Sequence, residues 1–264
     1  MNWHKFTLVA CLGGLSITLS TLAANVNFSR PCTSVGCKFL QLGKPPSQIS
    51  VEQLHHLAQA ITVKVMSQDF LGSGIVLQKQ GSVYLVLTNA HVLQAGDPPY
   101  RIQTPDGRIY KADLPKNVET LHLGFLQGND LALLQFRSTD SVYTVPSLGA
   151  KPGVGEEVFA AGFPSRGGGS KDKGFAFTTG KVLLVLQKAL KGGYQVGYTN
   201  NIEKGMSGGP LLNRRGLVVG VNGKHAYPLW DTPSVFADGK EADPALHQRI
   251  IHLSWAVPVG GSQK

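Results

Sequence analysis

Hydrophobic positions follow two rhythms along this chain, a helical one in a short early segment and a strand-like one over most of the rest. Ser50 and Gln53 form an S-x-x-Q capping box, which predicts that a helix begins there. We expect the adjacent His55 and His56 to face solvent rather than to bind a metal, because neighbouring helical residues point to different faces. Apolar residues recur at helical spacing to form the predicted buried stripe: Val51, Leu54, Leu57, Ala58 and Ile61.

Short apolar or alternating runs, separated by turn signals, fill the chain from residue 61 onward. Asp-Gly at 106–107 and Gly-Gly at 192–193 are typical turn dipeptides, and 166–174 reads as an exposed loop. Closely spaced short strands predict an all-β sandwich or barrels, with the Pro- and Gly-rich segment 138–157 linking two halves. The predicted strands are 61–65, 75–77, 83–88, 131–136, 158–161, 175–179, 182–186, 194–199 and 217–221.

Composition supports an all-β globular protein. The chain has 264 residues, of which 42% are hydrophobic and 16% charged, and these fractions exclude a disordered or collagen-like protein. Its 32 glycines and 15 prolines are usual for strands joined by tight turns. Lys and Arg number 25 against 16 Asp and Glu, a net charge of +9. Because these cations are scattered without a basic run, we expect no nucleic acid among the partners.

The N-terminus has the pattern of a signal peptide over residues 1–24. Lys5 precedes an apolar stretch from Phe6 to Leu19, and small residues ending at Ala24 suit cleavage. A retained membrane anchor is the alternative, although the stretch is short and rich in Ser, Thr and Gly. No other segment is expected to enter a membrane. We therefore predict export to the periplasm or the extracellular space.

Two cysteines remain if cleavage follows Ala24, because Cys11 is then lost. Cys32 and Cys37 are separated by four residues, and in an exported chain they most simply form one small-loop disulfide. Two thiols alone lack the further ligands of a closed metal site. We expect no metal at this pair.

Three short segments carry candidate chemistry, in the order His91, Asp130, Ser207. His91 follows an apolar run, Asp130 opens an apolar strand, and Ser207 lies in a Gly-x-Ser-Gly-Gly-Pro turn. A serine hydroxyl needs a base within hydrogen-bond reach, and histidine suits that role. A buried carboxylate fixes the imidazole tautomer and stabilises the imidazolium formed during attack. Glycines beside the serine let backbone amides face a developing oxyanion.

At these residues the sequence resembles the trypsin/chymotrypsin-like serine peptidases. The resemblance implies two antiparallel six-stranded β-barrels, over residues 61–145 and 146–259, after an extension at 25–60. It also implies a serine endopeptidase that acts on proteins or peptides through an acyl-enzyme, without metal or cofactor. His91 would be the base, Asp130 its orienting acid and Ser207 the nucleophile. The amides of Gly205 and Ser207 would form the oxyanion hole.

Further segments resemble the bacterial Deg/HtrA branch: Gly72-Ser73-Gly74, Gly162-Phe163-Pro164, Thr179–Val182 and Trp255–Pro258. Two features depart from the family. Trypsin has an aspartate just before the nucleophile, which pairs with a newly cut N-terminus, whereas this chain has Met206 there. The residues after the last strand are too few for a PDZ module, so we expect none.

The specificity pocket is predicted by family alignment. Its floor would lie at Asn201, with one wall near Asn222 and Gly223. An uncharged floor argues against a preference for Arg or Lys and favours uncharged side chains. Lys224 and His225 would favour acidic groups if they reach the pocket.

Two other functions compete with the peptidase interpretation. A catalytically silent trypsin fold would serve as a binding or chaperone module, although all three triad residues are present. An α/β-hydrolase esterase would use the G-x-S-x-G elbow at Ser207 with Asp231 or Asp243 and then His247. That fold needs a helix after the serine, and here Pro210 and a strand-like run follow.

The extension over residues 25–60 is open to two interpretations, an inhibitory propeptide or a structural arm. We favour an arm whose apolar helix face packs on the first barrel, because the stripe is continuous and the helix runs almost directly into the strand at residue 61. The sequence leaves the oligomeric state open.

Overall fold

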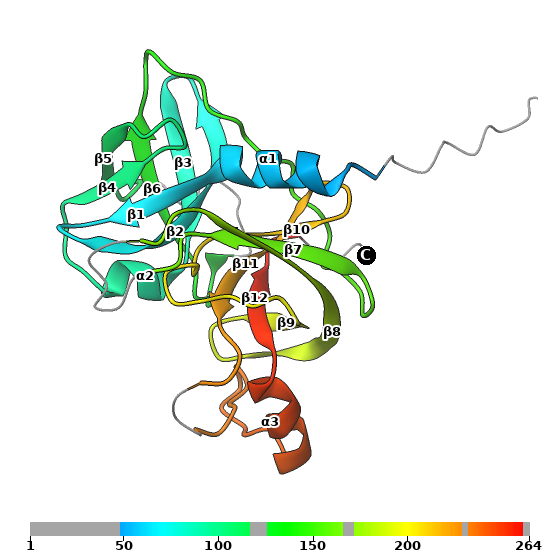
Figure 1. Ribbon diagram of the computed structural model, residues 1–264. Coiled ribbons are helices and arrows are strands. Elements are labelled where there is room, and N and C mark those ends of the chain that lie inside the picture. Colours follow the sequence, from blue (N-terminus) through cyan, green and yellow to red (C-terminus); the bar gives the residue numbers. More distant parts are fainter. Residues whose placement is uncertain (1–47, 117–125, 166–171, 229–231, 261–264) are drawn as a thin grey trace, which may run out of the picture. The chain divides into compact units, whose positions relative to one another are not determined.

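Two closed antiparallel β-barrels form the body of the computed structural model (Figure 1). The structure describes residues 48–116, 126–165, 172–228 and 232–260. The predicted signal peptide, the Cys32–Cys37 disulfide and most of the extension lie outside the described residues. None of the helices in these ranges is long and apolar enough to cross a membrane.

The first barrel contains the core residues Val63, Val65, Tyr84, Val86 and Leu134. Its strands are hydrogen-bonded in the order β1-β2-β3-β6-β5-β4. They are β1 (Thr62–Met66), β2 (Phe70–Gln80), β3 (Val83–Thr88), β4 (Tyr100–Gln103), β5 (Ile109–Asp113) and β6 (Ala132–Arg137).

The second barrel is closed in the order β10-β11-β12-β9-β8-β7, so each barrel has six strands, as predicted. The proposed boundary at 145/146 lies in the connection between β6 and β7. The strands are β7 (Glu157–Gly162), β8 (Ala176–Leu190), β9 (Tyr194–Tyr198), β10 (Pro210–Asn213), β11 (Val218–Lys224) and β12 (Ser254–Pro258). Two helices also occur outside the N-terminal segment, α2 (Ala90–Gln94) and α3 (Pro244–Ile251).

The all-β prediction is confirmed, but several element boundaries differ. The strands expected at 175–179 and 182–186 are one continuous strand, β8, which passes through Gly180. This glycine is needed because a Cβ there would lie 2.3 Å from Oδ1 of Asn200. Strands β4, β5 and β10 and helices α2 and α3 were not predicted. The three strands are short, and β4 and β5 mix charged with apolar positions, so pairing with neighbouring strands decides their conformation. The two helices have only five and eight residues.

Helix α1 (Val51–Ile61) begins at the expected capping box. The amide of Ser50 donates to Oε1 of Gln53 (2.8 Å), and the amide of Gln53 donates to Oγ of Ser50 (3.1 Å). Of the predicted stripe, Leu54, Ala58 and Ile61 are fully buried and Leu57 is partly buried, whereas Val51 is 40% exposed because it lies in the first turn of the helix. The expected docking surface was wrong, because α1 lies against β7 and β10 of the second barrel (Figure 1).

The prediction for the two histidines of α1 is half right. His56 is exposed, but His55 is half-buried against the rings of Phe175 (5.5 Å between centroids) and Phe177 (5.2 Å). These aromatics lie at the start of β8, more than 100 residues later in the chain, so the helix pattern alone could not reveal the contact.

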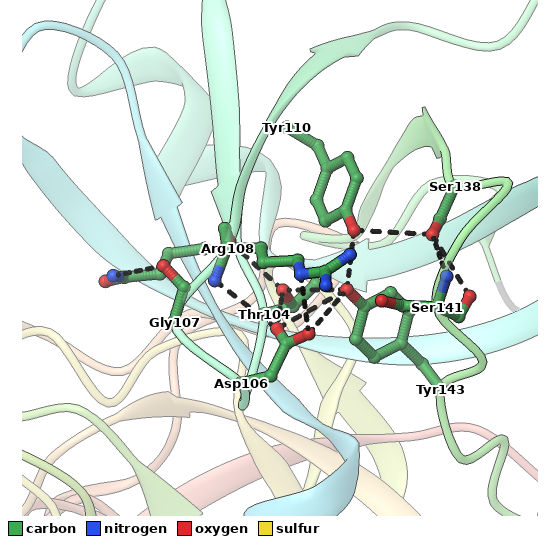
Figure 2. A network of polar contacts seen from close by, with 9 residues as sticks. Thr104, Asp106, Gly107, Arg108, Tyr110, Ser138, Ser141 and Tyr143 are labelled. Atoms are coloured by element: carbon green, nitrogen blue, oxygen red, sulfur yellow. Dashed lines mark hydrogen bonds and ion pairs between the residues drawn. The ribbon is translucent and has the colours of Figure 1, made fainter.

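A polar network holds the chain that leaves the first barrel against the β4–β5 hairpin (Figure 2). Asp106 in the hairpin turn accepts hydrogen bonds from Thr104 Oγ1 (2.6 Å) and from the hydroxyl of Tyr143 (3.1 Å). The Tyr143 hydroxyl lies 2.7 Å from that of Tyr110 on β5. Burial raises the pKa of Tyr143 to about 12, so its hydroxyl stays protonated and available as a donor at neutral pH.

Candidate active site

His91 and Asp130 are brought together by the pairing of two strands. His91 lies in α2 directly after β3, Asp130 lies just before β6, and Thr88 pairs with Ala132 across these strands. Nδ1 of His91 is 2.6 Å from Oδ2 of Asp130, and the amide of His91 donates to Oδ1 (2.9 Å). One carboxylate therefore holds both the imidazole and the backbone of the same residue.

Asp130 is held from both barrels. Its amide donates to the carbonyl of Gly192 in the β8–β9 turn (2.8 Å), and its carbonyl accepts from Nδ2 of Asn89 (2.7 Å). The hydroxyl of Tyr194, at the start of β9, donates to Oδ2 (2.5 Å). Burial by itself would raise the pKa of Asp130, but hydrogen bonds from His91 and Tyr194 outweigh it and lower the pKa. The carboxylate is therefore ionised and fully hydrogen-bonded.

Ser207 lies in a tight turn that only glycines permit on either side. Gly205 and Gly208 have φ values of +96° and +86°. A Cβ on Gly208 would lie 2.0 Å from the carbonyl oxygen of Ser73 and 2.3 Å from Oγ1 of Thr88. The serine loop of the second barrel thus rests directly on strands of the first.

Two amides beside Ser207 are unoccupied donors. Within the described part of the chain, neither the amide of Gly205 nor that of Ser207 donates a hydrogen bond, whereas those of Met206, Gly208 and Gly209 do. The Ser207 hydroxyl is 3.4 Å from the carbonyl oxygen of Gly223, and no hydrogen bond joins it to His91 among the described contacts. The buried side chain of Met206 packs in the core of the second barrel.

His91 and Ser207 both line one cavity of about 540 Å³. Its apolar wall includes Leu190, Ile250, Leu253 and Trp255, and its polar wall includes several lysines. Residues 232–235 form a further side, anchored where the amide of Lys191 donates to the carbonyl of Val235 (2.8 Å).

The residues predicted to form a specificity pocket occupy different positions. Gly223 lines the cavity, while Asn201 is exposed and is not among the lining residues. Asn222 is fully buried, accepts from the Tyr198 hydroxyl (2.8 Å) and donates to the carbonyl of Ala161 (3.1 Å). Its side chain therefore joins strands of the second barrel.

The residues of the esterase alternative do not assemble at Ser207. Asp243 caps α3 and accepts from the amide of Leu246 (2.9 Å), and His247 contacts the hydroxyl of Ser234 (3.0 Å between Oγ and Nδ1). Asp231 lies outside the described residues. No helix directly follows Ser207, because β10 begins three residues later. The strand-to-helix elbow of that alternative is absent here.

Tyr194 and the wall formed by residues 232–235 were missed by sequence reasoning. Tyr194 resembles Tyr198 in sequence context, since both lie in the same alternating strand. The only signal in the sequence was the Gly192-Gly193 dipeptide just before Tyr194, because glycines allow the backbone to pack closely against another part of the chain. A Cβ on Gly193 would lie 2.0 Å from Oδ1 of Asn129, so the turn can pack against the residue before Asp130 only as glycine.

Comparisons with known proteins identify the family of this chain. Residues 72–221 match the family described as "Trypsin-like peptidase domain". Serine endoprotease DegS of Haemophilus influenzae is 31% identical over 159 residues, which cover 58% of this chain and 41% of DegS. The periplasmic pH-dependent serine endoprotease DegQ of Escherichia coli is 31% identical over 153 residues, which cover 58% of this chain and 30% of DegQ. The chain thus spans less than half the length of these relatives.

A solved structure shares the fold. The crystal structure of the serine endoprotease from Yersinia pestis matches with a TM-score of 0.53 over 80% of this chain and 62% of that chain. The two are 21% identical in sequence, so this likeness speaks for the two-barrel fold alone.

Proposed function

Because the chain belongs to the trypsin-like peptidase domain family, we propose that it is a serine endopeptidase in which Ser207 forms an acyl-enzyme. The carrying observation is that His91, held by Asp130 at 2.6 Å, lines the same cavity as Ser207. The amides of Ser207 and Gly205 donate to no acceptor in the described residues. DegS and DegQ are serine endoproteases by name, which supports the same reaction here.

In the proposed reaction, Oγ of Ser207 turns from the Gly223 carbonyl and attacks the carbonyl carbon of the substrate. Its proton passes to Nε2 of His91, while Asp130 holds the Nδ1 proton and stabilises the imidazolium. The C–N bond then breaks as His91 returns the proton to the leaving amine. Water, activated by the same imidazole, hydrolyses the ester and regenerates the hydroxyl.

The amides of Gly205 and Ser207 would stabilise the oxyanion. The two amides are separated by one residue, the buried Met206, and neither donates a hydrogen bond to another described residue. Such donors act in transition-state stabilisation because they need no reorganisation as negative charge develops. Tyr194 would act as a positioning residue, since its hydroxyl reaches Asp130 and no reacting atom.

We also propose that the protein is exported, with residues 1–24 as signal peptide and Cys32–Cys37 as a disulfide. The name of DegQ gives a periplasmic location for that relative, which supports export. Residues 25–60 would form a structural arm. The buried face of α1 supports this role, because removing the helix would expose apolar surface of β7 and β10.

The test is covalent labelling with a fluorophosphonate together with hydrolysis of an unfolded protein substrate. We expect the label on Ser207 by mass spectrometry. Ser207→Ala should abolish labelling and lower kcat by about six orders of magnitude, since the triad acts as a unit. Ser147→Ala, at an exposed serine away from the cavity, is the matched control and should retain both activities. A folded wild-type protein that neither reacts nor cleaves would instead be a silent binding module.

A further inference from the structure

The cavity beside Ser207 is lined by cations and by no acidic side chain among the described residues. Lys191, Lys204 and Lys224 contribute to its wall, together with His91 and His225. Lys204 directly precedes the oxyanion glycine at 205, and Lys224 directly follows Gly223, whose carbonyl oxygen is 3.4 Å from the Ser207 hydroxyl. The three lysines therefore share one cavity with the Ser207 hydroxyl, the group proposed to attack the scissile bond.

None of these three lysines forms an ion pair in the described part of the chain, unlike several lysines elsewhere on the protein. Lys64 pairs with Asp172 (2.6 Å), Lys173 with Glu203 (2.5 Å) and Lys188 with Asp238 (2.7 Å). The cavity thus gathers three lysines that form no direct ion pair with a described carboxylate.

Lys224 is the most constrained of the three. Its ammonium lies 4.7 Å from the centroid of the Tyr194 ring. Lys224 is exposed as a whole residue, but partial desolvation at the cavity wall lowers the pKa of its ammonium. The charge of Asp130, which is already held by His91 and Tyr194, opposes this only in part. An anionic ligand would replace the lost solvation of this ammonium and stabilise its charged form.

The same cavity also has an apolar lining, which can contact hydrocarbon parts of a ligand. Leu190, Val235, Ile250, Leu253 and Trp255 contribute to it. A cavity with an apolar wall and several convergent cations suits a peptide segment that carries a carboxylate beside hydrocarbon surface. A segment rich in Lys or Arg would meet like charges.

We propose that this cavity selects substrates with a glutamate or aspartate side chain close to the scissile bond, held by Lys224 with Lys191 and Lys204. The inference rests on the proposed peptidase function. It predicts a preference for glutamate over its neutral isostere glutamine. It also predicts that this preference weakens as salt screens the exposed lysines.

The experiment uses a neutral parent peptide that the wild-type protein cleaves, and Glu/Gln pairs at each of about three positions on either side of the cleaved bond. At one or more positions we expect kcat/KM to be about tenfold higher with Glu than with Gln, as for a hydrogen bond to a charged group. The ratio should fall toward one in Lys224→Met and when ionic strength rises from about 0.05 M to about 1 M. Any effect of Lys224→Met on Asp130 changes kcat/KM for the Glu and the Gln peptide by the same factor, so it cancels in their ratio.

Lys181→Met is the matched control, because it removes one positive charge from an exposed position on β8 outside the cavity. It should keep the wild-type Glu/Gln ratio. An equal loss of preference in both variants would assign it to net charge and overturn the proposal.

Binding of the same pairs to Ser207→Ala, measured by calorimetry, tests the charge selectivity without turnover. Tighter binding of the Glu peptides supports the proposal. If the wild type cleaves peptides but shows a Glu/Gln ratio near one at every position, the acidic preference is wrong and the peptidase function stands. If the wild type cleaves nothing, the peptidase function fails, and equal binding of both peptides then rejects the selectivity as well.

Discussion

Asp130 shows how strongly a single carboxylate depends on donors from distant parts of the chain. Its oxygens accept from the amide and imidazole of His91 and from the hydroxyl of Tyr194, 64 residues later. Gly223 makes room for that hydroxyl, since a Cβ there would lie 2.3 Å from it. The orientation of the proposed catalytic acid is therefore shared between both barrels.

The positioning role of Tyr194 can be tested by removing one oxygen atom. Tyr194→Phe should lower kcat by about tenfold with little change in KM, because the lost hydrogen bond is to a charged group that does not touch substrate. Tyr198→Phe is the matched control, since it removes a buried hydroxyl from the same strand that donates to Asn222 instead. If steady-state kinetics show an equal loss of kcat in both variants, the positioning role of Tyr194 is wrong and its role is structural.

The lowered pKa of Asp130 gives a pH-dependent contribution to stability. A carboxylate whose folded pKa lies below its ordinary value of 3.8 stabilises the fold above that pH, and the contribution is lost as pH falls through the folded pKa. The free energy of unfolding of the wild type should therefore fall more steeply than that of Asp130→Asn between about pH 6 and about pH 2.5. Asp140→Asn, at an exposed aspartate, serves as control in the same denaturant titrations and should follow the wild type.

At the scale of elements, α1 is a helix whose ends are set locally and whose position is set by the second barrel. Its capping box lies within four residues of sequence, while its buried face meets β7 and β10. The amide of Ile49, just before the helix, donates to the carbonyl of Arg214 in the turn after β10 (3.3 Å). The helix is thereby joined to a hairpin more than 150 residues away in sequence.

The contribution of α1 to stability follows from its burial. Leu54→Ala removes a fully buried side chain and should destabilise the protein by about 3 kcal/mol. Val51→Ala, on the same helix at a residue that is 40% exposed, should change stability by less than about 0.5 kcal/mol. Chemical denaturation of the two variants checks this, and similar losses would contradict a docked helix.

At the scale of the whole described chain, Ser73 joins the two barrels directly beneath the nucleophile. Its hydroxyl donates to the carbonyl of Gly205 (2.8 Å) and accepts from the amide of Phe163 (2.9 Å). Its amide donates to the carbonyl of Ser207 (2.9 Å). The Gly-Ser-Gly segment of β2 therefore supports the loop that carries the proposed oxyanion hole.

Ser73→Ala should separate this supporting role from general stability. It leaves the buried carbonyl of Gly205 and the partly buried amide of Phe163 without their partner and should lower the free energy of unfolding by about 2 kcal/mol. Ser254→Ala removes a similarly buried hydroxyl that donates to the carbonyl of Asn200 (2.8 Å) within the second barrel. We expect comparable destabilisation in both, but a fall in kcat, of about tenfold, only for Ser73→Ala. Equal kcat values would show that the inter-barrel contact does not position the nucleophile.

The sequence by itself determined the all-β class, the helix at Ser50 and the order of His91, Asp130 and Ser207. These features depend on short-range physics: period-two alternation, a capping box and glycines that permit a tight turn. The sequence also predicted a turn at Gly192-Gly193. It could not reveal that this turn contacts Asn129 and Asp130, because that contact joins distant parts of the chain.

Only the tertiary structure decided which side chains meet. It placed α1 on the second barrel instead of the first, merged two expected strands into β8, and brought the Tyr194 hydroxyl to Asp130. It also gathered Lys191, Lys204 and Lys224 around one cavity. Such contacts depend on barrel closure, which brings strands far apart in sequence into fixed register, and no local pattern of residues carries that information.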